Sequence, residues 1–445
     1  MSSISLQGMP PRHHGCHRVW AQVLGSTLVS LSCYAQQTLT LDQSLRVAQG
    51  RSLQLVAQDA AAAASREMAV LAAQLPDPTL KVGINNLPVN GPDRFSLTRD
   101  FMTMRSVGVM QEITRRDKLK ARSARFDREA DVAEAGRWVA LANLRRDTAM
   151  AWLERYYQEQ MLVVLKTQRA EAALPIEAAD ASYRAGRGTQ ADVFAARASM
   201  AQIDDRIRQT EAQVATAKIR LARWVGDNAN QPLAAKPDVS TLNWNTASLD
   251  SRLQHHPQIA LMVKQEEVAR AAVDIAQSNT RSDWSVELMF NQRGSAYANM
   301  VSLNLSIPFQ FDPKNRQDRE VSAKLAVVEQ LRAEREEATR EDLAQIRIWL
   351  QQWQSNRDRL EHYDGAQIPL AADRTRAALA AYRGGSGSLA AVLEARRMEI
   401  EASLDRLRLE METASLWARL EYLIPTQQLA AGDGPARSPE PIAAK

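Results

Sequence analysis

The sequence contains an internal repeat. Residues 41–45 (LDQSL) are echoed by residues 249–253 (LDSRL), 208 positions later. Residues 181–188 (ASYRAGRG) are echoed by residues 380–387 (AAYRGGSG), 199 positions later. A repeat of this period has to be recognised before any motif is interpreted, because it means that one structural unit is used twice. The 445 residues are therefore expected to form one body with two similar halves.

Each half is expected to contain a helix, two amphipathic strands, a very long helix, a glycine turn and a further helix. The first half predicts helices over residues 42–75, 115–174 and 190–224, and strands near 79–85 and 106–110. The second half predicts helices over 249–279, 315–382 and up to 423, a perturbation at Pro369, and strands over 285–291 and 301–309. A helix of some 60 residues would be about 90 Å long, which is several times the average for globular proteins.

The repeats are expected to occupy most of the chain. The expected division is an export signal over 1–35, the first repeat over 36–226, a linker over 227–247, the second repeat over 248–424 and a disordered tail over 425–445. In the signal, Arg12 and Arg18 precede a short apolar run, and small residues flank a cleavage point after Ala35.

The cysteines offer one alternative for the N-terminus. Cys33 would be a lipid-bearing first residue if this were a lipoprotein signal, but Ser30 stands where such signals have leucine. Cys16 and Cys33 are the only cysteines, and both precede the cut after Ala35, so no disulfide or thiolate metal site is expected in the mature chain. No later stretch approaches 18 apolar residues, so no transmembrane helix is expected.

Charge and motifs exclude several classes of function. The net charge of +4 is small for this length, and no basic stripe interleaved with aromatic residues indicates nucleic-acid binding. No nucleophile–base pairing and no phosphate-binding loop is evident, so an enzyme is not expected and no cofactor is implied.

The strands point to a membrane protein once their context is considered. Alternating polar and apolar residues are typical of outer-membrane β-barrels, although a strand pair in a soluble α+β domain shows the same pattern. Here the strands recur at the same place in each repeat and join helices too long for a compact domain. Four strands cannot close a barrel, and open edges are not tolerated in lipid. Three chains would supply twelve strands, and their helices would continue the ring as a tube.

The turns carry a resemblance to a known family. From about residue 39 to 425, the sequence resembles the TolC-type family of outer-membrane efflux ducts. That family has an internal duplication and Tyr-x-x-Gly turns that close each helical hairpin, matched here by residues 183–186 (YRAG) and 382–385 (YRGG). Residues 106–113, 297–308 and 312–317 further resemble the heavy-metal branch of the family.

The resemblance implies a fold and a function. The fold would be mainly α, with a long α-helical barrel and a trimeric 12-stranded β-barrel to which each chain gives four strands. The trimer would lie in the outer membrane, extend into the periplasm, and contact outer-membrane lipid. It would bind a periplasmic adaptor protein and an inner-membrane pump of the resistance–nodulation–division class, and it would export heavy-metal cations.

The resemblance also implies site residues. Family members narrow at a periplasmic tip ringed by acidic side chains, which map here to Asp192 and Glu394, while Ala391 departs from the acidic type. The alternative for both carboxylates is that they are solvated charges or helix-start residues favoured by the helix dipole. The turn residues would face the adaptor: Tyr183, Gly186, Gly188, Tyr382, Gly384, Gly385 and Gly387.

Strand alternation predicts which side chains face the channel. Leu288, Leu303 and Leu305 are expected to face lipid. Glu287, Asn304 and Ser306 are expected to face the lumen.

Two groups of residues suggest metal binding only weakly. Met102 and Met104 in a loop are usually explained by packing, and His255 with His256 precedes Pro257 at a helix start. No metal site is predicted from them.

Other classes of function remain open. A multidrug efflux channel would show the same repeat. A periplasmic adaptor would show one helical hairpin flanked by β domains, whereas this sequence predicts two hairpins. A structural coiled-coil protein would not explain four amphipathic strands.

Overall fold

The structure is a computed structural model in which residues 38–244 and 255–425 are described. The chain divides into two units, residues 1–37 and residues 38–445. The expected export signal, the alternative lipid site at Cys33, the sequence echo at 249–253 and the expected tail beyond Pro425 lie outside the described residues.

The first repeat consists of helices interrupted by one pair of strands. In chain order its elements are α1 (Leu41–Arg51), α2 (Leu53–Ala72), β1 (Thr79–Asn85), β2 (Met104–Ile113), α3 (Arg116–Glu171), α4 (Ala173–Arg184) and α5 (Gln190–Val225), followed by the 3₁₀ turn η1 (Gly226–Asn230). The 56 residues of α3 span about 84 Å.

The single helix expected over 42–75 is wrong, because Ser52 divides it into α1 and α2. The backbone of Ser52 is extended, with φ −74° and ψ 104°, and its hydroxyl accepts a hydrogen bond from the Leu55 amide at 3.4 Å. Serine offers the backbone this alternative to helical hydrogen bonding, so it favours a cap over a helix interior.

The long helix expected over 115–174 likewise ends early, at Glu171. Pro175 has no amide proton, so it cannot donate to the Glu171 carbonyl one turn earlier, and its ring clashes with that carbonyl. The chain therefore breaks at Ala172 and resumes as α4.

The second repeat has the same order. Its elements are α7 (Pro257–Ser278), β3 (Trp284–Gln292), β4 (Met300–Ser306), the 3₁₀ turn η3 (Pro313–Asn315), α8 (Gln317–His362), the π turn η4 (Tyr363–Gln367), α9 (Ile368–Arg383) and α10 (Leu389–Glu421).

Two prolines shape this repeat. Pro369 cannot donate to the Gly365 carbonyl, and the resulting perturbation takes the form of the π turn η4 before α9. Pro308 stops β4 at Ser306, so the strand is shorter than the 301–309 predicted from alternation.

The strands form one antiparallel sheet in the order β1-β2-β3-β4. Each repeat contributes one hairpin, and β2 pairs with β3 across the repeats from Arg105 opposite Gln292 to Ile113 opposite Trp284. The expectation of a mainly helical chain with four strands is confirmed. Pairing of β2 with β3 means that β1 and β4 are the two outer strands of the sheet.

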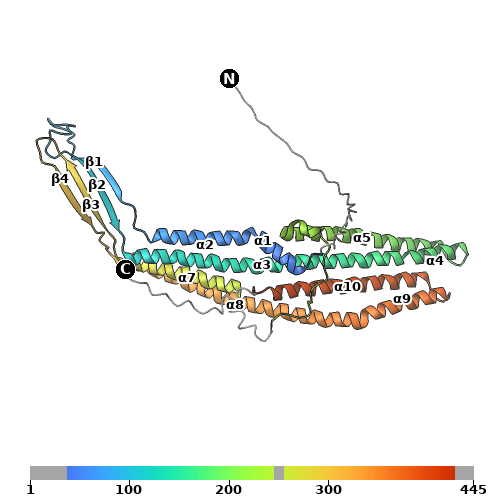
Figure 1. The fold of residues 1–445 in the computed structure, drawn as a ribbon. Helices are drawn as coiled ribbons and strands as arrows, with labels where there is room; N and C mark the ends of the chain where they lie inside the picture. The colour runs from blue at the N-terminus through green and yellow to red at the C-terminus, as the bar shows by residue number, and fades with distance from the viewer. Residues whose placement is uncertain (1–37, 245–254, 426–445) are drawn as a thin grey trace, which may run out of the picture. The chain divides into compact units, whose positions relative to one another are not determined.

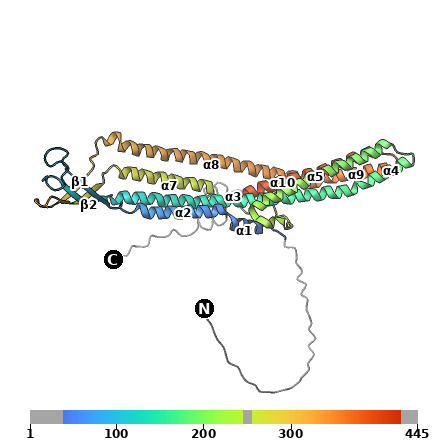
Figure 2. The ribbon, with the colours of Figure 1, turned by 90° about the horizontal axis from the view of Figure 1, so that it is seen from above.

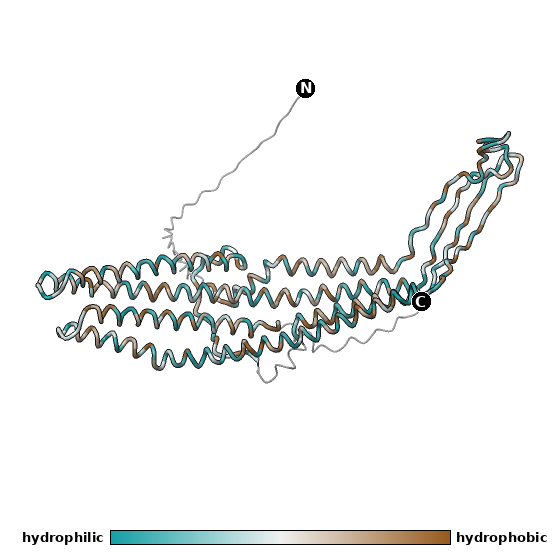
Figure 3. The backbone as a smooth tube through the Cα atoms, turned by 180° about the vertical axis from the view of Figure 1, so that it is seen from behind, coloured by the Kyte–Doolittle hydropathy of each residue, from teal (hydrophilic) through white to brown (hydrophobic). Residues whose placement is uncertain are grey.

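The helices run side by side, with the sheet at one end and the two hairpin turns at the other (Figures 1 and 2). Helix α3 contacts α2, α5, α7 and α10, and α10 also contacts α8 and α9. Hydrophobic and hydrophilic residues alternate along each helix (Figure 3), as expected for helices that bury one stripe.

The main core lies where the two repeats meet. It is built around the buried aromatic side chains of Trp152, Tyr157, Trp353 and Trp417. The segment after α5 is held against this core by Arg155, which is 2% exposed and donates to the carbonyl oxygens of Ala229 at 2.7 Å and Gln231 at 2.9 Å. Two charge-assisted bonds to backbone oxygens satisfy the buried guanidinium.

Candidate functional site

One face of the sheet is an exposed apolar surface. The rows that cross all four strands are Val82–Val107–Phe290–Val301 and Leu80–Val109–Leu288–Leu303. These eight side chains are between 45% and 76% exposed. In the next row, Ile84 is paired with Arg105, and Arg105 is paired with Gln292, so the apolar face ends there. An exposed apolar patch of this kind marks a surface that meets lipid or another chain.

The opposite face is polar and contains a chain of hydrogen bonds that crosses every strand. The Asn85 amide donates to Ser106 Oγ at 2.8 Å, and Ser106 Oγ donates to Asn291 Oδ1 at 2.6 Å. The Asn291 amide then donates to Ser302 Oγ at 2.9 Å. Ser106 and Asn291 are each only 4% exposed. We call these four residues the Asn/Ser chain.

The three residues expected to face a lumen lie on this polar face. Glu287 pairs with Asn304, and Ser306 pairs with Ser285. Leu288, Leu303 and Leu305 lie on the apolar face, so the division between faces follows the predicted alternation.

An ion pair on the polar face joins the first and third strands of the sheet. Lys81 on β1 binds Glu287 on β3 by reaching across β2 at Gly108. A Cβ atom at Gly108 would lie 2.6 Å from the Leu288 carbonyl oxygen and 3.0 Å from Met289 Cα. A side chain at this position would therefore collide with the backbone of β3, which favours glycine.

The two hairpin turns at the other end of the helices are built identically. In the first, the amides of Arg187 and Gly188 donate to the Ser182 carbonyl at 2.9 and 3.1 Å. In the second, the amides of Ser386 and Gly387 donate to the Ala381 carbonyl, both at 3.0 Å.

One glycine in each turn has a positive φ. Gly186 has φ +67° and Gly385 has φ +75°, and each donates its amide to the tyrosine carbonyl three residues earlier, Tyr183 or Tyr382. This left-handed conformation after a helix favours glycine. Gly384 continues α9 with an αR backbone as its C-cap residue.

Asp192 takes part in the N-terminal cap of α5. Its carboxylate accepts hydrogen bonds from the Thr189 amide at 3.0 Å and the Thr189 hydroxyl at 2.7 Å, and its own amide donates to Thr189 Oγ1 at 3.2 Å. This is a capping box. The Thr189 hydrogen bonds hold the pKa of Asp192 below its ordinary value.

Glu394 pairs with a neighbour on its own helix. Arg397 donates to both carboxylate oxygens, at 2.8 and 3.1 Å, and these hydrogen bonds keep the Glu394 pKa low. The structure therefore gives Asp192 and Glu394 separate partners. It brings their helices together nearby, where Val193 on α5 packs in one cluster with Leu389 on α10.

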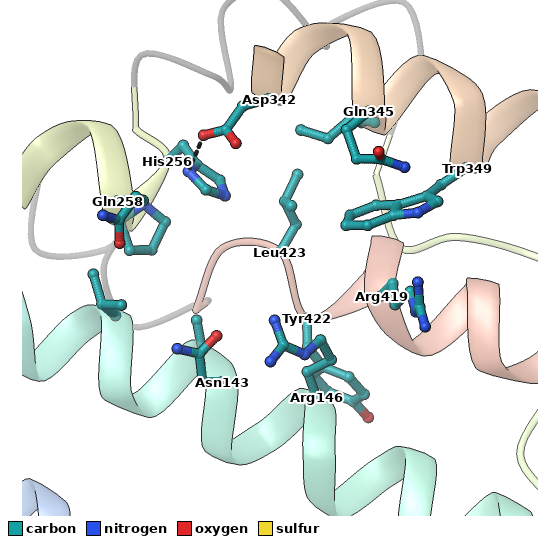
Figure 4. Close-up of a pocket in the computed structure, with 14 residues that line it drawn as sticks. Asn143, Arg146, His256, Gln258, Asp342, Gln345, Trp349, Arg419, Tyr422 and Leu423 are labelled. Atoms are coloured by element: carbon teal, nitrogen blue, oxygen red, sulfur yellow. Dashed lines mark ion pairs between the residues drawn. The ribbon is translucent and has the colours of Figure 1, made fainter. Parts of the chain in front are cut away.

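A pocket at the junction of α3, α7, α8 and α10 holds His256, one of the residues considered for metal binding (Figure 4). Its Nδ1 lies 3.4 Å from Asp342 Oδ2. Burial lowers the pKa of His256, and Asp342 partly opposes that shift. Within residues 38–244 and 255–425, no three His, Cys, Asp or Glu side chains are grouped to hold a metal ion.

Of the two methionines expected in a loop, Met102 lies between β1 and β2 and is 46% exposed, whereas Met104 is the first residue of strand β2. In the described part of the chain, no helix is both long enough and apolar enough to cross a membrane.

Sequence reasoning missed the Asn/Ser chain. Asn85, Ser106, Asn291 and Ser302 all occupy polar positions of the alternation, which was the available signal. Their convergence depends on the strand register, which the sequence does not reveal.

Comparisons with known proteins place this fold. No protein-family model matches the sequence, and no curated protein matches it. The outer-membrane channel OprN is similar in structure with TM-score 0.72 and 16% identity, over 87% of this chain and 90% of that one. The outer membrane protein VceC from Vibrio cholerae is similar with TM-score 0.69 and 18% identity, over 86% of this chain and 95% of that one.

CusC, whose crystal structures concern folding and transmembrane channel formation, gives TM-score 0.69 and 14% identity, over 85% of this chain and 91% of that one. Likeness at these identities establishes the fold. The chain has the fold of these channel proteins, with long helical hairpins and one four-stranded antiparallel sheet.

Proposed function

We propose that this chain is the outer-membrane exit channel of a three-part efflux system. The observation that carries the proposal is the two-faced sheet, with one exposed apolar face and one hydrogen-bonded polar face. Among the described residues, β1 and β4 each have one edge without a partner strand. A sheet of this kind is suited to lipid outside and water inside.

Three copies of the chain complete the sheet. Lipid does not tolerate open strand edges, because each unpaired backbone group costs several kcal/mol. Three sheets of four strands give twelve, an even number that leaves an aqueous lumen. Glu287, Asn304 and Ser306 then line the lumen, and Leu288, Leu303 and Leu305 face lipid.

The helices continue this tube through the periplasm, and the two glycine turns form its tip. Residues 36–226 and 248–424 are the repeats, joined by residues 227–247, and residues 1–35 direct export. The turns are the surface for a periplasmic adaptor, which links the channel to an inner-membrane pump of the resistance–nodulation–division class. Asp192 and Glu394 lie near the pore axis there and favour cations.

Assembly in detergent tests the proposal. Amine-reactive crosslinking of the protein purified from outer membranes should give three linked subunits. A monodisperse monomer that stays soluble without detergent would exclude this function.

We propose heavy-metal cations as the cargo. The support is the resemblance of residues 106–113, 297–308 and 312–317 to the heavy-metal branch. Deleting the gene should lower tolerance to copper, silver, zinc, cobalt or cadmium and leave antibiotic tolerance unchanged. The opposite result would assign the chain to multidrug efflux.

A further inference from the structure

The two outer strands of the sheet offer complementary ends of the Asn/Ser chain. At the β1 edge, the Asn85 amide group is used as a donor to Ser106. Its Oδ1 accepts no hydrogen bond within the described residues. At the β4 edge, Ser302 Oγ accepts from Asn291, and its hydroxyl proton has no acceptor in the same part of the chain.

The direction of hydrogen bonding is the same at every step. Each asparagine donates its amide to the next serine, and Ser106 donates its hydroxyl to the next asparagine, Asn291. A donor is therefore left at one edge and an acceptor at the other. In the single chain Asn85 is exposed and Ser302 is partly buried, so both are open to a partner. If another strand covers them, each needs a hydrogen bond to replace its water, and the donor and the acceptor complement each other.

We infer that β4 of one copy of this chain pairs antiparallel with β1 of a second copy, with Ser302 directly opposite Asn85, so that the Ser302 hydroxyl donates to the next copy's Asn85 Oδ1. This inference rests on the proposed function, and it adds the register of the interface. The Asn/Ser chain then closes into a continuous ring around the lumen.

The geometry within one chain selects this register. Ser106 and Asn291 are directly opposite each other. The two steps from asparagine to serine are diagonal, because Asn85 is opposite Met104 and Asn291 is opposite Met300. The serine that donates to an asparagine is therefore directly opposite it within the chain. By the same geometry, Ser302 is expected directly opposite Asn85 of the next copy.

The same register pairs residues on the apolar face of the sheet. With Ser302 opposite Asn85, Leu303 meets Ile84 and Leu305 meets Val82. Each of these four side chains is at least 52% exposed in the single chain. Pairing also places the last apolar position, Ile307, opposite Leu80, beyond the end of β4.

The apolar residues of each strand are shifted along the sheet relative to those of the strand before it. This shift supports the same register independently. The apolar row of β1 is centred on Val82, which aligns with Val301 through the paired strands. The apolar row of β4 runs from Val301 to Ile307, so its centre lies about three residues further towards the helices, roughly one residue for each strand crossed. One more strand gives four residues, which brings Leu305 opposite the next Val82.

The resulting stagger is that of a closed barrel. Four residues for each copy give about 12 residues for twelve strands. Strand tilt follows the ratio of stagger to strand number, and an equal ratio in eight-stranded barrels gives a tilt of ≈ 36°. Outer-membrane strands are tilted by about 35–45°. The register is therefore compatible with closure.

Cysteine pairs test this register directly, because a disulfide requires Cα atoms within about 7 Å, and directly opposite residues lie about 4.5–5.5 Å apart. The double variants Leu303→Cys with Ile84→Cys, and Leu305→Cys with Val82→Cys, should form linked dimers and trimers on oxidation in outer membranes. The unsubstituted chain, whose only cysteines are Cys16 and Cys33, is the background control.

The same four positions in exchanged combinations provide matched controls. Leu303→Cys with Val82→Cys reports a slip of two residues in one direction, and Leu305→Cys with Ile84→Cys reports a slip in the other. Each should crosslink at least several-fold less than the predicted pairs. Stronger crosslinking of an exchanged pair would overturn the register.

Failure of the inference is separable from failure of the proposed function. Amine-reactive crosslinking of each variant reports whether trimers assemble. Trimers in which no cysteine pair crosslinks would overturn the edge pairing and leave the channel in place. Monomers throughout, including the unsubstituted chain, would overturn both.

Discussion

The indole of Trp152 donates a hydrogen bond to the carbonyl oxygen of Leu39, at 3.1 Å. The second repeat reproduces this contact, because the indole of Trp353 donates to the Val239 carbonyl at 3.2 Å. The two tryptophans are 0% and 4% exposed. In each half of the chain, a long helix thus holds an extended segment through one buried tryptophan, and the two contacts lie about 200 residues apart in sequence. The internal repeat therefore includes buried core contacts.

Removing one of these indole donors should destabilise the core. The substitution Trp353→Phe leaves the buried Val239 carbonyl unsatisfied, at a cost of about 1–3 kcal/mol. Thermal unfolding followed by circular dichroism should show a lower midpoint for Trp353→Phe. The control is Trp349→Phe, one helical turn away and only partly buried. Equal effects of the two substitutions would show that lost packing alone is responsible.

Much of the fold follows from local sequence signals. Alternation located the strands, and the Tyr-x-x-Gly motif located both turns. Breaks in helices were harder, because Ser52 acts through a cap that competes only weakly with helix propensity. Pro175 breaks the chain at the carbonyl four residues earlier.

The sites were less predictable than the elements. Asp192 could be placed near the tip by its motif, but its capping bonds to Thr189 depend on side-chain geometry. The counterpart of Trp152 could not be chosen from sequence, because Trp349 and Trp353 lie one helical turn apart. Only the fold shows that Trp353 contacts the linker.

Alanine in the hairpin turns should weaken them without unfolding the chain. Gly186→Ala and Gly385→Ala place a side chain at positive φ, which costs about 1–2 kcal/mol for each residue. We expect trimers to form normally and binding to the adaptor to fall, as measured by co-purification. Gly365→Ala is the control, because Gly365 has no positive φ, and at all three positions a Cβ has no atom within 4 Å. Normal adaptor binding by both turn variants would place the docking surface elsewhere.

Neutralising the two tip carboxylates should reduce the cation preference of the channel. The double substitution Asp192→Asn and Glu394→Gln removes charge from each copy and retains side-chain shape. Conductance in planar bilayers should show weaker cation selectivity and weaker block by divalent ions. Asp205→Asn, on the exposed surface of α5, is the control. Selectivity that is identical in all three proteins would rule out a ring of charge at the tip.

The same carboxylates should keep their charge in moderately acidic solution. Hydrogen bonds from Thr189 and Arg397 favour the ionised forms and lower both pKa values. Cation preference should therefore persist as the pH falls through the ordinary range of Asp and Glu, near 4, and be lost only below it. Reversal potentials measured between pH 7 and pH 3 would reveal this. Loss of preference already at pH 5 would indicate carboxylates with raised pKa values.

An arginine scan of β4 should separate the two faces of the sheet. Leu303→Arg places a charge on the exposed apolar face, where the cost at the bilayer midplane is about 2–4 kcal/mol. Asn304→Arg, the next residue, places the same charge on the polar face beside Glu287, where water and an acidic neighbour accept it. We expect Leu303→Arg to reduce the yield of heat-resistant trimer in outer membranes, and Asn304→Arg to assemble at close to the normal yield with altered conductance. Equal yields for both variants would contradict a lipid-facing role for the apolar face.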